Sequence, residues 1–452
     1  MRHSMYVQNH FGAKPFDICT TDNYNKTNRK EKVMMKKVYL CIDLKTFFAS
    51  VECSERHLDP FKTNLVVADP TRGNGALCLA ITPKMKSMGI HNRCRIFEIP
   101  KGVEYITAMP RMHLYMEYSA RIYRIYCRYV SPDDIHVYSI DECFIDITSY
   151  MHLYHKSAKE FAKMLMQAVF EDTHITATCG IGTNLYLAKV ALDIISKHTK
   201  ENIGILDEER YQKYLWHHLP ITDFWHMGSG TANHLLRLGV VDMHGITQIP
   251  EEVLYKEFGI NAEYIIDHAW GREPATIASI KKYHPKNESI NNSQVLFSDY
   301  KYEDALLVVK EMVELNVLRL IESRLVTNHI SLYIGYSRTD GGGWAGGSRK
   351  LTVRTNSLSI LMDEFISLYH LKVKKGRMIR QISISFGDVL DESYESYDLF
   401  SDREALEEEK KLQRTLVSIR HKYGKNAILK LMNKQEKATT EKRNTLIGGH
   451  NA

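Results

Sequence analysis

The sequence is short of the features that mark membrane, secreted and zinc-finger proteins. Among its 452 residues, no apolar run approaches the roughly 18 residues that a membrane-spanning helix needs. No apolar stretch of the secretory kind follows Met1. The eight cysteines stand singly, without a Cys-x-x-Cys pair, which argues against a cysteine zinc site and a disulfide framework. We therefore expect a cytoplasmic protein with reduced thiols and no membrane partner.

The excess of basic over acidic residues is also small. The formal net charge is +6, with 44% hydrophobic and 25% charged residues, which is typical of a soluble globular protein. A mildly basic balance permits nucleic acid as a partner without demanding it. The length predicts about two to four domains.

The first half of the chain predicts one mixed domain and one helical domain. Residues 1–33 are polar and have no period, so we expect a flexible extension. Between Val38 and Ile195, apolar strand-like runs alternate with helical patterns, which predicts an α/β or α+β core. The segment 208–272 is purely helical in pattern.

The second half predicts a separate small domain. Residues 276–288 are polar and weakly patterned, as an interdomain linker is. Residues 289–390 then follow the order β-α-β-β-α-β, a known small-domain arrangement. Residues 391–452 form a strongly charged tail with helical character.

Three acidic residues follow apolar strands. Asp43 ends the strand-like run Val38–Ile42, and Asp141 and Glu142 lie near the junction of two more such runs. Phosphoryl transfer needs charge neutralised on the reacting phosphate, and two divalent ions about 3.5–4 Å apart do this well. Mg²⁺ prefers carboxylate oxygens. For Asp43 alone an ordinary surface acid is the better reading. For the three together a metal site is favoured, because each follows a strand that would otherwise bury it.

These segments resemble the metal-binding motifs of the Y-family, or translesion, DNA polymerases. The resemblance is carried by four segments: Ile42–Glu52, Tyr138–Asp146, Cys179–Ala191 and Phe224–Val240. The last two are similar to the family's Gly-Ile-Gly-x-Asn segment and its helix-hairpin-helix. The resemblance covers about residues 38–386, and details at Arg93–Pro100 are similar to the UmuC-like members of Gram-positive bacteria and their phages.

The resemblance implies an α+β right-hand polymerase with palm, small fingers, helical thumb and a separate little finger. The implied ranges are palm 34–46 and 113–199, fingers 47–112, thumb 200–275 and little finger 289–390. The implied reaction is attack of a primer 3′-hydroxyl on the α-phosphate of a dNTP, in low-fidelity DNA damage tolerance and repair. The implied partner is primer-template DNA, bound by a monomer.

The resemblance also implies a metal centre. Two Mg²⁺ would be held by Asp43, Asp141, Glu142 and the Leu44 carbonyl. These groups offer the oxygen ligands that the ion prefers.

Further roles are implied for the nucleotide site. Phe48 would be the steric gate that excludes a ribose 2′-hydroxyl. The triphosphate would contact Phe47, Phe48, Lys86 and Lys189. Read without the family, Phe47 and Phe48 are ordinary core aromatics, which suits Phe47 better, and Lys86 is a solvated surface lysine.

DNA contacts are implied in the C-terminal half. Gly228 and Thr231 of the hairpin would direct backbone N–H groups at a phosphate, although an ordinary αα-hairpin has the same pattern. Basic residues near the expected strands could meet phosphates or serve solvation alone: Arg338, Arg349, Lys350 and Arg354.

A clamp partner is implied near the C-terminus. Ser396–Phe400 resembles a sliding-clamp motif with Leu399 and Phe400 as anchors. Packing of this pair on the chain's own body is the alternative.

Two other functions remain open on the residues alone. A non-catalytic subunit could scaffold a repair complex, but it would have no use for the three acids. A palm-fold nucleotide cyclase uses similar carboxylates, but it would need neither a helix-hairpin-helix nor a basic C-terminal domain.

Overall fold

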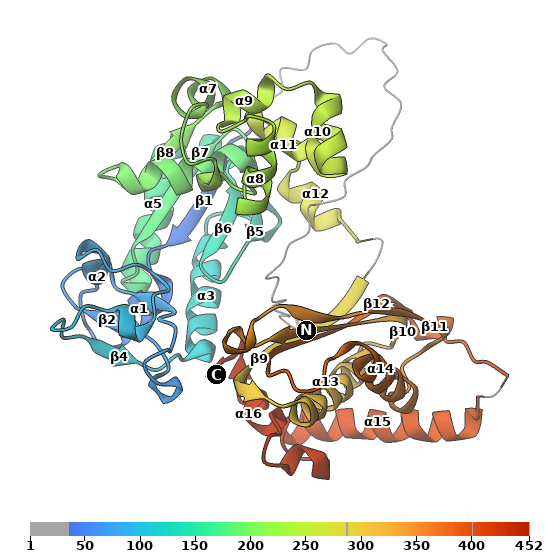
Figure 1. Cartoon of the computed structure of the whole chain (residues 1–452). Coiled ribbons are helices and arrows are strands. Elements are labelled where there is room, and N and C mark those ends of the chain that lie inside the picture. The colour runs from blue at the N-terminus through green and yellow to red at the C-terminus, as the bar shows by residue number, and fades with distance from the viewer. Residues whose placement is uncertain (1–35, 286–287, 400, 452) are drawn as a thin grey trace. The chain divides into compact units, whose positions relative to one another are not determined.

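The computed structural model describes residues 36–285, 288–399 and 401–451. The chain forms two compact units, one ending at Tyr283 and the other beginning at His284 (Figure 1). The expected flexible extension, residues 1–33, lies outside the described residues. Of the helices in the described ranges, none combines the length and the apolar character needed to cross a bilayer.

A five-stranded sheet forms the centre of the first unit, in the order β5-β6-β1-β7-β8. Its strands are β1 (Tyr39–Leu44), β5 (Ile135–Val137), β6 (Glu142–Asp146), β7 (Ala177–Gly182) and β8 (Ile203–Leu206). β1 pairs antiparallel with both β6 and β7, and it is apolar on both faces, as a strand covered on both sides should be. β8 continues this sheet beyond residue 199, where the sequence placed the end of the palm.

Helices cover both faces of this sheet. Helices α3 (Met112–Tyr126) and α5 (Ala158–Thr173) pack on the face that carries Leu40 and Ile42. The opposite face carries Cys41, which packs against α6 (Leu185–Val190). A π-helical turn (Ala191–Ile195) and a 3₁₀ turn (Ser196–His198) extend α6.

Two glycines let α6 lie directly on β7. A Cβ atom on Gly180 would stand 2.0 Å from the carbonyl oxygen of Ala188, and one on Gly182 would stand 2.2 Å from the Ala188 nitrogen. No side chain fits at either position without moving the helix backbone. The glycines of this segment therefore set the height of α6, and with it Lys189, above the sheet.

A smaller layer follows β1 in the chain. It is a three-stranded sheet in the order β3-β2-β4 with two short helices. Its elements are α1 (Phe47–Glu55), β2 (Leu65–Val67), β3 (Ala80–Ile81), α2 (Pro83–Ser87) and β4 (Ile106–Ala108). A further short helix, α4 (Tyr150–Leu153), follows β6.

The helical region predicted for 208–272 is confirmed. It contains α7 (Glu208–Leu215), α8 (Ser229–Arg237), α9 (Met243–Thr247), α10 (Glu251–Phe258) and α11 (Ala262–Ala269). These helices share an apolar core of their own, which includes Tyr211, Leu235 and Ile265.

The prediction of a linker at 276–288 is wrong for the first half of this range, which is helical. Residues Ile277–Lys282 form helix α12, which begins at the capping side chain of Thr276. Ile277 is buried beside Tyr39 and Phe144 of the central sheet, and the Lys281 ammonium donates to the Pro132 carbonyl. A helix with so few apolar residues has too weak a period to be seen in the sequence.

The second unit confirms the order β-α-β-β-α-β. Its sheet has the order β11-β10-β12-β9. The elements are β9 (Glu288–Tyr300), α13 (Tyr302–Glu322), β10 (Leu325–Tyr336), β11 (Trp344–Thr355), α14 (Leu358–Lys372) and β12 (Ile379–Asp391). Alternate residues of β10, Ile330, Leu332 and Ile334, are buried in the core shared with α13 and α14, so one face of the sheet is covered.

The predicted charged tail is folded back on this unit. Helix α15 (Arg403–Tyr423) packs along α13, and α16 (Thr440–Asn444) with a short hairpin, β13 (Leu446–Ile447) and β14 (His450–Asn451), follows. The buried carboxylate of Glu311 on α13 accepts hydrogen bonds from Asn433 Nδ2 at 3.0 Å and from the backbone N–H of Thr439 at 2.7 Å. The prediction of a tail is therefore corrected. Polar contacts such as those of Glu311 and Glu409 hold a segment without an apolar period against the second unit.

Candidate active site

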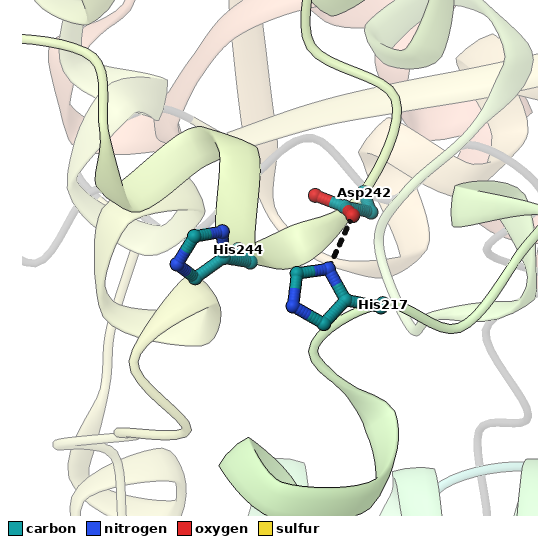
Figure 2. A group of neighbouring side chains, drawn as sticks. All are labelled: His217, Asp242 and His244. Carbon is teal, nitrogen blue, oxygen red and sulfur yellow. Dashed lines mark hydrogen bonds and ion pairs between the residues drawn. The ribbon is translucent and has the colours of Figure 1, made fainter.

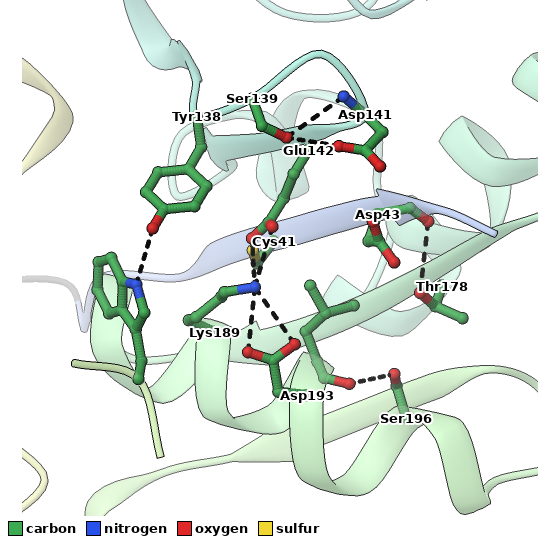
Figure 3. Close-up of polar contacts among 12 residues, drawn as sticks. Cys41, Asp43, Tyr138, Ser139, Asp141, Glu142, Thr178, Lys189, Asp193 and Ser196 are labelled. Atoms are coloured by element: carbon green, nitrogen blue, oxygen red, sulfur yellow. Dashed lines mark hydrogen bonds and ion pairs between the residues drawn. The ribbon is translucent and has the colours of Figure 1, made fainter. Parts of the chain in front are cut away.

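The strand register brings the predicted acids together. In the antiparallel pair of β1 and β6, Asp43 lies directly opposite Glu142. The backbone N–H of Leu44 donates to the Asp141 carbonyl at 3.0 Å, which ties the end of β1 to the residue before β6. Although Asp43 lies far from the other two in the chain, the three acids occupy one corner of the sheet (Figure 3).

This corner holds more negative charge than its surroundings compensate. The pKa of Asp43 is raised to about 7, first by burial and then by the nearby charges of Asp141 and Glu142. Lys189 and Lys197 oppose the shift without cancelling it. A half-buried carboxylate with a raised pKa beside two others is a site that a cation would stabilise.

Glu142 is paired with a lysine. The Lys189 ammonium lies 2.8 Å and 2.9 Å from the two Glu142 oxygens, and 3.0 Å from Asp193 (Figure 3). The Cys41 thiol donates to Glu142 at 3.0 Å. Burial raises the pKa of Glu142 and Lys189 partly opposes this. The three carboxylates thus share a corner, but among the described residues they do not form a set of ligand atoms that all lie within 4.8 Å of one another.

Asp141 is held by its own turn. The Ser139 hydroxyl donates to the Asp141 carboxylate at 2.6 Å (Figure 3). The Thr178 hydroxyl donates to the Asp43 carbonyl at 3.3 Å from the neighbouring strand β7. The protein's own hydrogen bonds therefore order the backbone around both acids.

The two lysines predicted to bind the triphosphate have different surroundings. Lys189 is buried in its ion pairs with Glu142 and Asp193. Lys86 on α2 is exposed, although partial burial of its amine lowers its pKa and the Asp43 charge opposes that shift. Sequence reasoning missed Lys197, whose charge acts on both Asp43 and Lys86. Its position four residues after Asp193 on an irregular helix gave no signal.

The two phenylalanines at the start of α1 differ in burial, as the sequence predicts. Phe47 is buried in the apolar core, whereas Phe48 is only partly buried. The Phe48 ring stacks on Tyr115 with ring centroids 4.6 Å apart. Tyr115 in turn donates to the fully buried Glu52 at 2.7 Å, and Arg111 donates to the same carboxylate at 2.8 Å and 2.9 Å. The Phe48 ring therefore packs on Tyr115, which is itself held by hydrogen bonds to Glu52.

The predicted hairpin lies in the helical region. Gly228 is the N-cap of α8 and a side chain there would meet nothing within 4 Å, while Thr231 lies in the first turn. The indole N–H of Trp225 donates to the Tyr138 hydroxyl at 3.1 Å. This contact ties the start of the hairpin to the loop that leads into Asp141.

The basic residues of the second unit do not share one face. Arg349 pairs with Glu364 of α14 at 2.6 Å, so its side chain faces the helices. Lys350 is exposed and lies on the other face, by the alternation of β11. Arg354, which shares the parity of Lys350, donates to the Asp388 carbonyl. Arg338 is exposed in the turn after β10.

The predicted clamp motif is only partly described. The Ser396 backbone N–H donates to the Arg354 carbonyl at 2.9 Å, which fixes the start of the motif at the end of β11. Leu399 is 98% exposed, so it does not pack on the chain's own body. Phe400 lies outside the described residues.

Known proteins are similar to this chain in sequence and in fold. The profile of the impB/mucB/samB family matches residues 42–193, and that of the impB/mucB/samB family C-terminal domain matches residues 287–399. The UV-damage repair protein named UvrX, from Bacillus subtilis, is 31% identical over 92% of this chain and 98% of its own length. DNA polymerase IV 2 of Halalkalibacterium halodurans is 27% identical over 92% of this chain and 100% of its own length. A solved Y-family DNA polymerase chimera of Dbh and Dpo4 has the same fold, with a TM-score of 0.59 and 20% identity over 78% of this chain and 99% of that one.

We expect Asp43→Asn to stabilise the metal-free protein at pH 8. The folded state raises the pKa of Asp43 from 3.8 to about 7, so the ionised carboxyl costs stability at every pH above 7. Removing the charge should raise the unfolding free energy by about 1–3 kcal/mol in a denaturant titration. The gain should shrink as the pH falls from 7 toward 4, where the folded wild-type carboxyl takes up a proton.

The matched control for this measurement is Asp146→Asn at the other end of β6. Asp146 pairs with Lys37 at 2.7 Å, so its loss should leave stability unchanged or slightly lower. Equal stability of Asp43→Asn and wild type at pH 8 would contradict the charge imbalance.

Proposed function

Because this chain belongs to the impB/mucB/samB family and is a Y-family DNA polymerase of translesion synthesis and DNA repair, we propose that Asp43, Asp141 and Glu142 form its metal-binding centre. The observation that supports this most is the register that sets Asp43 opposite Glu142. Burial and, after it, the charges of Asp141 and Glu142 raise the pKa of Asp43, and a divalent cation would stabilise the ionised carboxylates there.

The donor set fits two Mg²⁺ ions. Asp43, Asp141 and Glu142 offer carboxylate oxygens and Leu44 offers a main-chain carbonyl, which are the oxygen ligands that hard cations prefer. Such ions, when bound, activate the primer 3′-hydroxyl and steady the triphosphate. The protein's own part is to hold these oxygens on a preformed sheet corner. No side chain is needed as a nucleophile, because the primer hydroxyl attacks the α-phosphate of the dNTP and pyrophosphate leaves.

Lys189 has a double role in this proposal. It neutralises Glu142 and is itself braced by Asp193, at 2.8 Å and 3.0 Å respectively. An incoming triphosphate offers the same kind of anionic oxygen, so Lys189 can exchange part of its pairing for a phosphate and leave Glu142 available as a ligand. Lys86 is the second proposed triphosphate contact. The nearby Asp43 charge acts to raise the pKa of its amine.

The proposal assigns the parts of a right-hand polymerase to the described elements. The five-stranded sheet with α3, α5 and α6 is the palm, and the layer from α1 to β4 is the fingers. The helices from α7 to α11 are the thumb, and β9 to β12 with α13 and α14 are the little finger.

Primer-template DNA is proposed to lie on the face of the little-finger sheet that α13 and α14 leave uncovered. That face carries small hydroxyl side chains such as Ser293 and Ser383, which bond each other at 2.6 Å, and the exposed Lys350. The same face also carries the exposed aromatic pair Tyr333 and Trp344. Its hydroxyl groups and the Lys350 ammonium are groups that can contact a phosphate backbone. Arg349 belongs to the opposite face and is left out of this surface.

The thumb is proposed to add a second contact with the DNA backbone. Gly228 and Thr231 stand at the start of α8, where N–H groups of the first turn have no partner within the helix. Because no side chain covers Gly228, a phosphate could approach these N–H groups closely.

Primer extension on intact and damaged templates tests the proposed centre. We expect Asp141→Asn to lower the rate roughly thousandfold, equivalent to about 4 kcal/mol in the barrier, because a carboxylate ligand is lost. Asp146→Asn should extend primers at the wild-type rate. Full activity of Asp141→Asn would sink the proposal, and inactivity of the wild-type protein would favour a scaffold instead.

Phe48 is proposed as the gate against ribonucleotides. Its ring is fixed by stacking on Tyr115, so it cannot move aside for a 2′-hydroxyl. We expect Phe48→Ala to lower the preference for dNTP over NTP, measured as a ratio of kcat/KM values, by about a hundredfold. Phe48→Tyr keeps the ring and should keep the preference. An unchanged ratio in Phe48→Ala would refute the gate.

Leu399 and Phe400 are proposed as anchors for the replication sliding clamp. The near-complete exposure of Leu399 on a segment fixed at Ser396 presents a side chain to a partner. We expect Leu399→Ala to weaken clamp binding about tenfold in a surface-binding assay, with primer extension in the absence of clamp unchanged. Leu412→Ala, on exposed α15, serves as the control and should bind normally. Equal affinity of both variants would exclude the motif.

A further inference from the structure

Two histidines and an aspartate meet in the helical region, away from the three acids. They are His217, which follows α7, Asp242, and His244 at the start of α9 (Figure 2). One ligand atom from each of the three lies within 4.8 Å of the others. Within the described residues this is the one group of histidine, cysteine and acidic side chains gathered so closely.

The backbone holds the three residues in place. Asp242 is the N-cap of α9, and its Oδ1 accepts the backbone N–H of Gly245 at 2.7 Å. That leaves Oδ2 to face His217, whose Nδ1 lies 2.8 Å away. The His244 backbone N–H donates to the Trp216 carbonyl at 3.1 Å, which joins the two segments directly. The carboxylate is thus oriented by a cap and not only by the histidine.

The rings are also arranged by packing. The His217 and His244 rings have centroids 4.8 Å apart, and His244 packs on Trp216 with centroids 5.0 Å apart. The His217 side chain is 70% exposed, so it can rotate, whereas Asp242 is 17% exposed and fixed. The set therefore combines one anchored oxygen, one packed ring and one mobile ring.

Two imidazole nitrogens and one carboxylate oxygen are ligands of zinc. Zn²⁺ takes such a set with bonds of about 2.0–2.2 Å, which places the donor atoms about 3.4 Å apart in a tetrahedron. The exposed His217 can rotate to bring its ring nitrogen to such a distance from the other two ligand atoms. The fourth position is then left for water, as in zinc sites with three protein ligands. Mg²⁺ prefers an all-oxygen shell, so the site discriminates against the ion proposed at the active centre.

We propose that His217, Asp242 and His244 bind one Zn²⁺ ion, which links the end of α7 to the start of α9. The ion would replace the His217–Asp242 hydrogen bond with three bonds across the two segments. It stabilises the helical region from which the hairpin at Gly228 projects. The site needs no cysteine, so the scattered cysteines of the sequence do not speak against it.

Calorimetric titration of the full chain with Zn²⁺ tests this site, at pH 7.5 with Mg²⁺ in excess to occupy the acidic corner. We expect one Zn²⁺ per chain in the wild type. His217→Asn and His244→Asn should each weaken binding at least about tenfold, since lesser changes around metal ligands already cost that much. Asp242→Asn keeps the helix cap while removing the anionic ligand, so it should weaken binding without unfolding α9.

His218→Asn is the matched control. His218 is the next residue in the chain but pairs with Asp223 at 2.9 Å, outside the cluster, and its loss should leave Zn²⁺ binding unchanged. The melting temperature provides a second readout, because Zn²⁺ should raise it for wild type and His218→Asn and not for His217→Asn. Failure of the wild type to bind Zn²⁺, or equal binding by the double variant His217→Asn/His244→Asn, would overturn the proposal and leave an ordinary surface ion pair.

Discussion

The partial burial of Asp43 beside two other carboxylates, at the junction of β1 and β6, is the constraint on which the rest of the site depends. Antiparallel pairing places Asp43 opposite Glu142, and the partial burial of Asp43 reduces the screening of its charge by water. The folded chain carries this unfavourable arrangement because the apolar strands on either side hold it in place. A divalent cation would neutralise this charge, as the proposed metal-dependent phosphoryl transfer requires.

The surrounding fold neutralises the charge of one of these acids, Glu142, with a lysine. Gly180 and Gly182 let α6 lie directly on the sheet, and this height brings the Lys189 ammonium onto Glu142. Asp193 shares the same ammonium, so the lysine is held from two sides. Before substrate binds, one acid is therefore neutralised by protein and the Asp43 side is left poorly compensated.

Features with a strong local pattern could be predicted from the sequence. The apolar run before Asp43, the Asp-Glu pair and the β-α-β-β-α-β unit each follow from period and composition, and the family resemblance added the roles. Features that depend on tertiary contacts could not. The helix at Ile277 has too few apolar residues, and the fold-back of the C-terminal segment rests on polar contacts such as those of the buried Glu311. Arg349 faces inward because a helix packs against its strand. His217 and His244 stand 27 positions apart, with no spacing that marks a shared ligand set.

Counting bound ions tests the proposed metal centre most directly. Mn²⁺ can replace Mg²⁺ at oxygen sites and its free concentration is measurable by electron paramagnetic resonance. With primer-template DNA and a non-reactive dNTP analogue present, we expect two Mn²⁺ per wild-type chain at the acidic corner, both lost or greatly weakened in a chain carrying Asp43→Asn and Asp141→Asn together. The His217→Asn background removes any contribution from the second cluster. Equal Mn²⁺ binding with and without the two acids would contradict a carboxylate metal centre at this corner.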